Sequence, residues 1–197
     1  MRGRIAAAES RTVLDAMLAV FAVVPPYRLR VKSGAYVINR MTNCGSLGWH
    51  SDKKGYRYVD RHPELDVPWP EIPRDVKALA MAVADEAGVP FEPDACLVNF
   101  YDAAGKMNLH QDHDEKDFAW PIVSFSFGCD AVFALGGAKR RDPVQNVRLR
   151  HGDVLVMHGE SRMRFHGVKK IVPETAPFAH EAIPAGGRLN LTFRRAA

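Results

Sequence analysis

The stretch "CLVNFYDAAGKMNLHQD", from Cys96 to Asp112, contains two segments in which apolar and polar residues alternate. This two-residue alternation in "CLVNFY" and "KMNLHQD" is typical of β-strands. The connecting "DAAG" is short, polar and ends in glycine, as hairpin connections often do. The stretch therefore predicts two antiparallel strands at the start of a β-rich region.

The same pattern continues to the C-terminus. Further short strand-like segments follow, separated by Gly, Asp or Pro turns: "PIVSFSFG", "AVFALG", "VRLR", "DVLVMH", "MRFHGV" and "LNLTFRR". About eight short strands at this spacing are typical of an antiparallel sandwich or barrel. We predict an α+β fold in which a double-stranded β-helix, or jelly roll, is supported by N-terminal helices.

The residues before Cys96 supply the predicted helices. An apolar stretch near the N-terminus contains Glu9, Arg11 and Asp15 and ends at Pro25, so it is too short and too charged for a membrane span. We expect a helix there, with neither a signal peptide nor a membrane segment. The other predicted elements are a helix in "RDVKALAMAVADEAG", strands in "AYVINRM" and "GYRYVD", and loops in "TNCGSLGW" and "HPELDVPWPEIPR".

Composition limits the class of protein. A chain of 197 residues with 47% hydrophobic and 25% charged residues is typical of one globular domain. The three cysteines are widely separated and form no CxxC pair, which favours a reducing cytoplasm over a disulfide framework. The net charge of +4 is compatible with a nucleic-acid partner but does not require one.

A histidine and a carboxylate lie two residues apart in "LHQDHD". On a strand, His110 and Asp112 would share one face with Asp114 beyond them, while Gln111 and His113 would face away. A histidine and a carboxylate are two of the three ligands of the 2-His-1-carboxylate site that binds ferrous iron. The spacing leaves His158 and His166 both possible as the third ligand. The alternative is that the motif is a chance feature of a polar hairpin.

The last predicted strand, "GGRLNLTFRR", has a polar face and an apolar face. The polar face carries Arg188, Asn190, Thr192 and Arg194, and leucines and a phenylalanine occupy the other. Arginine offers two parallel donors to a carboxylate, which suits a dicarboxylate such as 2-oxoglutarate. The alternative is a solvated basic edge strand.

Seven motifs, in this order, together resemble the AlkB family of iron(II)- and 2-oxoglutarate-dependent DNA-repair dioxygenases: "MTNCGSLGW", "PDACLVNFY", "LHQDHDE", "PIVSFSFG", "HGDVLVMHGESR", "FHGV" and "RLNLTFR". The resemblance extends from about Ser33 to Arg195. It implies Fe(II), 2-oxoglutarate and O2 as cofactor and cosubstrates. It also implies His110, Asp112 and His166 as iron ligands, which selects His166 over His158.

The resemblance implies roles for further residues. The expected 2-oxoglutarate contacts are Arg188 and Arg194, with Asn99, Tyr101 and Asn190 completing the hydrogen bonds. The expected substrate contacts are Trp49, which would stack on a flipped base against His110; Tyr56 in the same lid; Asp114, which would accept from an exocyclic amino group; and Arg162 as a neighbour of the pocket. Trp49 could instead be a packing residue, and Tyr58 could fill the underside of the lid. Lys139, Arg140 and Arg141 resemble a hairpin near the nucleic acid, or a solvated turn.

The resemblance also implies an organisation and a reaction. We expect a single domain, 1–197, with a helical segment at 1–32, a nucleotide-recognition lid at 33–70, and a supporting helix and dioxygenase jelly roll at 71–197. The implied activity is oxidative demethylation of bases such as 1-methyladenine and 3-methylcytosine, with release of formaldehyde, succinate and CO2. The expected partner is alkylated single-stranded DNA, with RNA second, and the expected state is a cytoplasmic monomer without membrane contact.

Two rival hypotheses remain at this point. The first keeps the oxygen chemistry but gives the enzyme an RNA, protein or small-molecule substrate. The second is a non-catalytic jelly roll in which zinc fills the His/Asp/His site. The Arg188 and Arg194 pair speaks against the second, because a structural zinc site does not use a dicarboxylate anchor.

Overall fold

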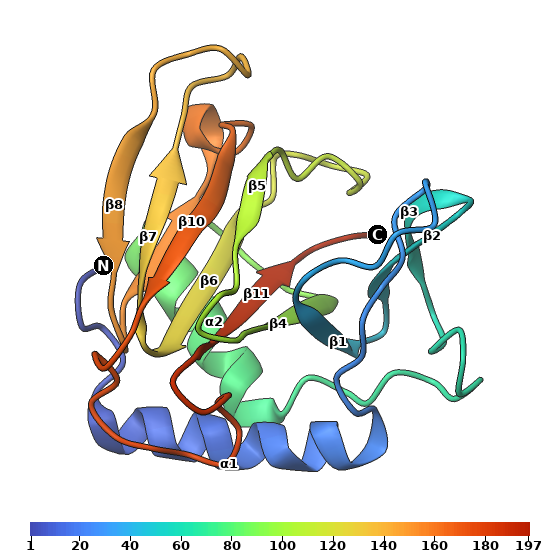
Figure 1. Ribbon diagram of the computed structural model, residues 1–197, viewed down its shortest axis with the longest axis horizontal. Coiled ribbons are helices and arrows are strands. Elements are labelled where there is room, and N and C mark those ends of the chain that lie inside the picture. The colour runs from blue at the N-terminus through green and yellow to red at the C-terminus, as the bar shows by residue number, and fades with distance from the viewer.

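The computed structural model describes residues 1–197 and contains two α-helices, eleven strands and one short 3-10 helix (Figure 1). The elements in chain order are α1 (Ala7–Val23), β1 (Arg40–Gly45), β2 (Gly48–Asp52), β3 (Gly55–Val59), α2 (Arg74–Glu86), β4 (Ala95–Tyr101), β5 (Met107–His110), β6 (Ile122–Gly128), β7 (Asp130–Leu135), β8 (Gln145–Leu149), β9 (Val154–Met157), η1 (Gly159–Ser161), β10 (His166–Val172) and β11 (Arg188–Arg194).

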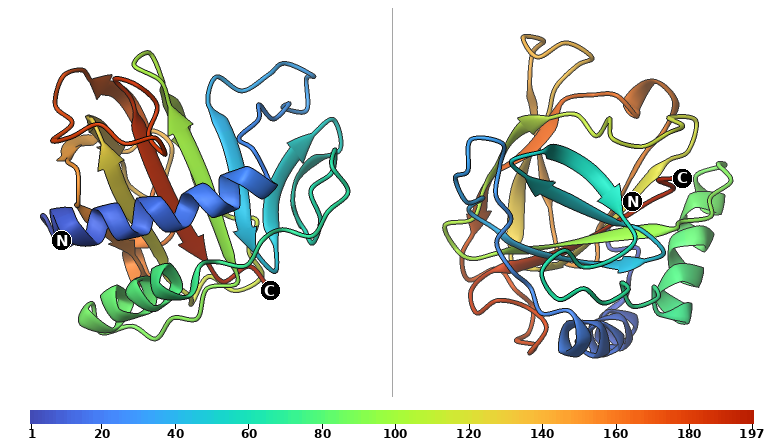
Figure 2. Two further views of the ribbon diagram at one scale, coloured as in Figure 1. Left: turned by 90° about the horizontal axis from the view of Figure 1, so that it is seen from below. Right: turned by 90° about the vertical axis from the view of Figure 1, so that its right-hand side faces the viewer.

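The strands form two facing antiparallel sheets and one separate hairpin. The larger sheet has the order β1-β4-β11-β6-β9, and the smaller has the order β5-β10-β7-β8. The β2–β3 hairpin forms its own two-stranded sheet and lies across one end of the other two (Figure 2, right). This arrangement is the predicted jelly roll, so the fold class is confirmed.

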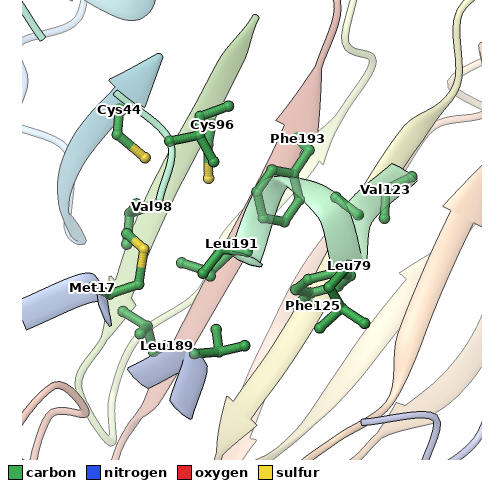
Figure 3. Close-up of a cluster of buried hydrophobic side chains, with 14 of the residues drawn as sticks. Met17, Cys44, Leu79, Cys96, Val98, Val123, Phe125, Leu189, Leu191 and Phe193 are labelled. Atoms are coloured by element: carbon green, nitrogen blue, oxygen red, sulfur yellow. The ribbon is translucent and has the colours of Figure 1, made fainter. Parts of the chain in front are cut away.

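Both helices cover the outer face of the five-stranded sheet (Figure 2). Leu189, Leu191 and Phe193 of β11 are fully buried there and pack in one core with Met17 of α1 and Leu79 of α2 (Figure 3). Because side chains alternate along a strand, the polar residues of β11 must face the opposite side, between the two sheets. Neither helix is both long enough and apolar enough to cross a bilayer.

The two faces of the β2–β3 hairpin make different contacts. Trp49 lies directly opposite Tyr58 in its register, and Gly55 closes the turn at a φ of 106° that glycine tolerates best. On the other side, Gly48 lies so close to the Trp69 ring that a Cβ atom would overlap it. One face of the hairpin is thus packed against residues 60–70, and the face that carries Trp49 is turned toward the two larger sheets.

The structure corrects several predicted boundaries. The strand expected at residues 35–41 is displaced, because β1 begins only at Arg40 and includes all of the "TNCG" expected as a loop. The same expected loop also includes Gly48 and Trp49, which are the first two residues of β2. The polar side chains of β1 led to the prediction of a loop. Thr42 and Asn43 are instead buried and hydrogen-bonded to the carbonyl oxygens of Val24 and Trp49.

Two further corrections concern the predicted site strands. β5 ends at His110, so Asp112 and His113 lie in the loop that follows and not on the strand. β10 begins at His166, so "MRF" before it is also outside the strand. The strand alternation used to place Asp112 with His110 and to exclude His113 therefore does not apply.

Candidate active site

A cavity of about 630 Å³ opens between the two sheets beneath the β2–β3 hairpin. Its apolar lining includes Val31, Met41, Leu97 and Met107, and its polar lining comes from the hairpin, both sheets and the loop after β5. Eleven of the twelve residues predicted for the metal, the cosubstrate and the base line it: His110, Asp112, His166, Asn99, Tyr101, Arg188, Asn190, Arg194, Trp49, Tyr56 and Asp114.

 Eleven of the twelve therefore share one cavity, and Arg162 is the exception.

His110, Asp112 and His166 form a compact cluster at the centre of this cavity. Their ligand atoms all lie within 4.8 Å of one another. His110 and His166 are opposite each other across β5 and β10, and their Nε2 atoms lie 3.5 and 3.9 Å from the same oxygen, Oδ1 of Asp112. The cluster is therefore assembled by strand pairing together with the turn of the loop after His110.

Both histidines are oriented through their second ring nitrogen. The Nδ1 atoms lie 2.8 Å from the Asn108 carbonyl oxygen and 3.0 Å from the Arg164 carbonyl oxygen. A carbonyl only accepts, so each Nδ1 donates, and in the neutral ring that binds a metal each Nε2 keeps a free lone pair. Two neutral imidazoles and one carboxylate are a donor set that suits ferrous iron.

The charge of Asp112 is stabilised by its neighbours. Burial opposes its ionisation, but the Arg194 guanidinium and the two histidines outweigh burial and hold the pKa of Asp112 well below its usual range. Arg194 donates from Nη2 to Oδ2 of Asp112 at 2.6 Å. The carboxylate is therefore ionised at neutral pH, as a metal ligand must be.

The residues predicted to contact 2-oxoglutarate lie beside this cluster on two neighbouring strands. Arg188 pairs with Tyr101, and Asn190 with Asn99, across β11 and β4. Arg188 is 1% exposed, and burial lowers its pKa to about 10, which leaves it charged at neutral pH. The Nε atom of Arg188 and the Oδ1 atom of Asn99 are buried without a hydrogen-bond partner in the protein.

These two unpartnered atoms indicate what kind of ligand the cavity binds. Buried polar atoms are nearly always hydrogen-bonded in native proteins, so two such atoms on the wall of one cavity indicate a polar ligand. Arg188 and Arg194 give the cavity two buried guanidinium groups. The residues present therefore fit a dicarboxylate that lies next to a metal ion.

Trp49 is held from two directions at the cavity mouth. Its backbone N–H donates to Oδ1 of Asn43 at 2.9 Å, and its carbonyl accepts from Nδ2 of Asn43 at 3.0 Å. Its indole N–H donates to Oδ2 of Asp114 at 2.8 Å, and its ring stacks on Tyr56 with centroids 5.4 Å apart. The indole is therefore a fixed surface, and Asn43 is a supporting residue that the sequence analysis did not identify.

Arg162 lies behind the cavity wall. It is 2% exposed, and its guanidinium donates to the carbonyls of Asp112 and Trp120 and to the carboxylate of Glu115. These contacts fix the loop that carries Asp112, and they leave the guanidinium outside the cavity lining. Arg162 is predicted as a neighbour of the pocket, and the structure places it behind the lining, against the loop that carries Asp112.

Two cavity residues have roles that sequence reasoning did not assign. Glu115 lines the cavity and binds Arg162, but one acid among many in "HQDHDE" carries no distinguishing signal. Arg140 also lines it, donating to the Leu109 carbonyl at 2.9 Å with its guanidinium 4.8 Å from the Phe165 ring. The basic hairpin noted in the sequence was the available signal for Arg140.

Comparison with known proteins agrees with this geometry. Residues 2–194 match the family model of the 2OG-Fe(II) oxygenase superfamily. The chain is 43% identical over 194 residues to the alpha-ketoglutarate-dependent dioxygenase AlkB homolog of Caulobacter vibrioides, covering 98% of this chain and 85% of that protein. It is 40% identical over 173 residues to the DNA N(6)-methyladenine demethylase ALKBH1D of Arabidopsis thaliana, covering 77% of this chain and 38% of that protein.

A solved structure supports the same conclusion. The structure of OsALKBH1 superposes with a TM-score of 0.85 at 29% sequence identity, covering 99% of this chain and 95% of that one. The family model and the bacterial relative both extend over nearly the whole chain. The chain therefore belongs to the AlkB family of the 2OG-Fe(II) oxygenase superfamily, and it is a dioxygenase that uses Fe(II), 2-oxoglutarate and O2.

Proposed function

We propose that this dioxygenase removes methyl groups from alkylated bases in single-stranded DNA, with RNA as a second substrate. The observation that carries the proposal is the fixed indole of Trp49, which lies in the same cavity as the metal cluster and the arginine pair. Bound Fe(II), 2-oxoglutarate and O2 supply oxidation of the N-methyl carbon, which ends in formaldehyde, succinate and CO2. The protein supplies binding, orientation and exclusion of competing reactions.

The metal would be held by Nε2 of His110, Nε2 of His166 and the carboxylate of Asp112. The free Nε2 lone pairs and the ionised carboxylate support this assignment. Arg188 and Arg194 would bind the two carboxylates of 2-oxoglutarate, since each guanidinium offers paired donors. Polar groups of Asn99, Tyr101 and Asn190 would surround the cosubstrate, because all three line the same wall.

The base would lie between Trp49 and His110. A methyl group inside a stacked helix cannot reach the metal cluster, so the base has to leave the stack. Methylation on the pairing edge of adenine or cytosine adds positive charge, which an indole face and the Asp114 carboxylate both favour. Tyr56, stacked on Trp49, would complete the base-binding surface. Arg162 would act on the substrate only through the loop that it fixes.

The same assignment gives each part of the chain a role. Residues 33–70, which include the β2–β3 hairpin, would be the nucleotide-recognition lid over the jelly roll of residues 71–197. The helical segment 1–32 would be part of the same single domain, because α1 packs in the main core. A single strand is favoured because its bases leave the stack at lower cost. Lys139, Arg140 and Arg141 would contact phosphates, and the protein would act as a monomer.

The decisive experiment measures succinate and formaldehyde side by side with Fe(II), 2-oxoglutarate and a methylated oligonucleotide. Single-stranded DNA, duplex DNA, RNA and a methylated peptide are compared as substrates. Formaldehyde release from 1-methyladenine or 3-methylcytosine in single-stranded DNA supports the proposal. Release from RNA or peptide alone would move the assignment to another substrate class.

Trp49→Ala separates base recognition from oxygen chemistry. Stacking on an aromatic side chain contributes about 1–3 kcal/mol per base, so formaldehyde release should fall by roughly ten-fold to a hundred-fold. Slow conversion of 2-oxoglutarate to succinate without DNA should persist, because the metal cluster is unchanged. Trp49→Phe is the matched variant and should restore part of the loss. Equal loss of both products in folded Trp49→Ala would assign Trp49 a structural role.

A further inference from the structure

The β2–β3 hairpin is tied to the loop after Asp112 at two adjacent points. The indole N–H of Trp49 donates to Asp114 at 2.8 Å, and the hydroxyl of Tyr58 donates to Oε1 of Glu115 at 2.6 Å. Trp49 and Tyr58 are directly opposite each other in the hairpin register. One cross-strand pair therefore meets two consecutive acidic residues, and the second contact has no part in the proposed binding of the base.

Glu115 is a buried carboxylate with several donors. Its side chain is 2% exposed, its Oε2 accepts from Nη2 of Arg162 at 2.9 Å, and its Oε1 lies 3.2 Å from Nε of Arg194. Burial raises the pKa of Tyr58, so its hydroxyl stays protonated and remains a donor. The Oε1 atom is thus shared between the hairpin hydroxyl and the Arg194 guanidinium.

Arg194 is in turn shared between two carboxylates. Its Nη2 lies 2.6 Å from Oδ2 of Asp112, and its Nε lies 3.2 Å from both that oxygen and Oε1 of Glu115. The guanidinium position therefore depends on how strongly each carboxylate attracts it. Without the Tyr58 hydroxyl, Glu115 has one donor fewer and attracts Arg194 more strongly, because a buried acceptor left unsatisfied is costly.

We propose that Tyr58 is a positioning residue that acts through Glu115 on Arg194 and so couples the hairpin to the 2-oxoglutarate site. The proposal rests on the proposed function, which assigns Arg194 to a 2-oxoglutarate carboxylate. Coupling between two binding sites is reciprocal. Nucleic acid that holds the hairpin in place would keep the Tyr58–Glu115 hydrogen bond and so tighten 2-oxoglutarate binding, and 2-oxoglutarate would tighten nucleic-acid binding by the same factor.

The first test is calorimetric titration of 2-oxoglutarate into the protein loaded with Mn²⁺ in place of Fe(II), without nucleic acid and without turnover. Tyr58→Phe removes only the hydroxyl and should weaken 2-oxoglutarate binding by about three-fold to ten-fold, the range of one lost hydrogen bond. The matched control is Tyr36→Phe, which removes an exposed hydroxyl bonded to Arg30 and should leave 2-oxoglutarate binding unchanged.

The second test measures affinity for a methylated single-stranded oligonucleotide with and without 2-oxoglutarate. In the wild-type protein 2-oxoglutarate should tighten oligonucleotide binding. In Tyr58→Phe the ratio of the oligonucleotide affinities with and without 2-oxoglutarate, here called the oligonucleotide factor, should fall toward one. In a Glu115→Gln background, Tyr58→Phe should have no further effect on 2-oxoglutarate affinity. If Glu115→Gln does not fold, the change in the oligonucleotide factor decides the matter.

Two results would overturn different claims. Wild-type 2-oxoglutarate affinity and an unchanged oligonucleotide factor in folded Tyr58→Phe would overturn the coupling while the proposed function stood. A wild-type protein that neither binds nor demethylates the oligonucleotide would overturn the proposed substrate. In that case, the effect of Tyr58→Phe on 2-oxoglutarate binding would still be measurable.

Discussion

His110, Asp112 and His166 are oriented by different contacts but direct their ligand atoms to one point. We predict that replacing any one of them by alanine abolishes formaldehyde release, because the loss of one of three protein ligands weakens the metal severely. The control is His158→Ala, since His158 is exposed and lies outside the cavity lining. Metal content and turnover are measured together.

His113→Ala is the sharper comparison within the same loop. Its side chain is 57% exposed and lies 3.2 Å from Asp114, and it is not part of the three-residue cluster. We expect its variant to keep stoichiometric metal. The assignment of the cluster would be wrong if His113→Ala lost the metal while His110→Ala retained it.

Arg188 is the second residue whose geometry can be tested by a conservative change. In Arg188→Lys the charge remains but the planar fork that contacts Ser126 and the Cys129 carbonyl is lost. We predict that the 2-oxoglutarate concentration needed for half-maximal activity rises by roughly ten-fold, about 1.4 kcal/mol. The matched control is Arg195→Lys, just after the end of the same strand, which should follow the wild-type curve.

For individual residues, the sequence predicted which types of side chain form the site better than it predicted which side chains contact one another. The spacing of His110 and Asp112 suggested two ligands, but only the family resemblance selected His166, because strand pairing brings together residues far apart in the chain. The resemblance also pointed to Arg162, yet the buried contact of Arg162 with Glu115 depends on loop geometry that a residue pattern does not contain.

Among the elements, the β2–β3 hairpin and the segment after it carry two buried histidines. The Nδ1 atom of His62 accepts from the N–H groups of Glu64 and Leu65, both at 3.2 Å, and only the unprotonated atom can do so. Burial lowers the pKa of His62 and of His50, whose Nδ1 is buried without a partner. Asp52 and Glu64 oppose this shift only in part, and Arg57 adds to it at His50.

The sign of the resulting pH dependence follows from these shifts. The unfolded histidines bind protons near their ordinary pKa of 6.5, whereas the folded ones bind them only at lower pH. The contribution of these two histidines to stability is therefore fully present above 6.5 and is lost as the pH falls below that value. We predict faster hydrogen exchange of β2 and β3 amides at pH 5.5 than at pH 7.5, after correction for intrinsic rates. In His62→Gln, which keeps a side-chain acceptor without titrating, this pH dependence should be weaker. An identical dependence in both proteins would contradict the assignment.

The elements also differ in how well their pattern predicted them. β11 alternates fully between core and cavity, so both its strand character and its polar face were predictable from "RLNLTFR". β1 was misplaced because Thr42 and Asn43 are buried polar residues whose hydrogen-bond partners lie on other segments. Alternation identifies a strand whose two faces differ in polarity, as in β11, and fails where polar side chains are buried without that alternation, as in β1.

In the whole molecule, the site is assembled from both sheets. The metal cluster comes from the four-stranded sheet and the loop after β5, while Arg188 and Arg194 come from the five-stranded sheet. Ligands that bind only the folded state stabilise it by about 2.7 kcal/mol at a hundred times their Kd. We predict that Mn²⁺ with 2-oxoglutarate raises the melting temperature above that measured in chelator, and that Arg188→Lys reduces the increment added by 2-oxoglutarate. Equal increments in both proteins would contradict the role of Arg188.

The order of the strands was the feature least accessible from the sequence. β11 is the last strand in the chain but lies between β4 and β6, in the middle of the larger sheet. The number and spacing of the strands predicted a jelly roll. Which strands lie side by side depends instead on pairing between segments that are far apart in the chain. Only the position of β11 explains why Arg188 and Asn190 lie opposite Tyr101 and Asn99 of β4.

The register of the β2–β3 hairpin has an evolutionary consequence. Trp49 and Tyr58 both reach the loop after Asp112 only because they are paired across a turn of fixed length that closes at Gly55. Side chains alternate with a period of two, so inserting or deleting one turn residue and shifting the pairing by one would direct one of the two aromatics outward. Such length variants would leave the jelly roll intact while disabling the hairpin. Natural variation at this turn should therefore be confined to substitutions, even though the turn is an exposed loop tip where changes in length are ordinarily tolerated.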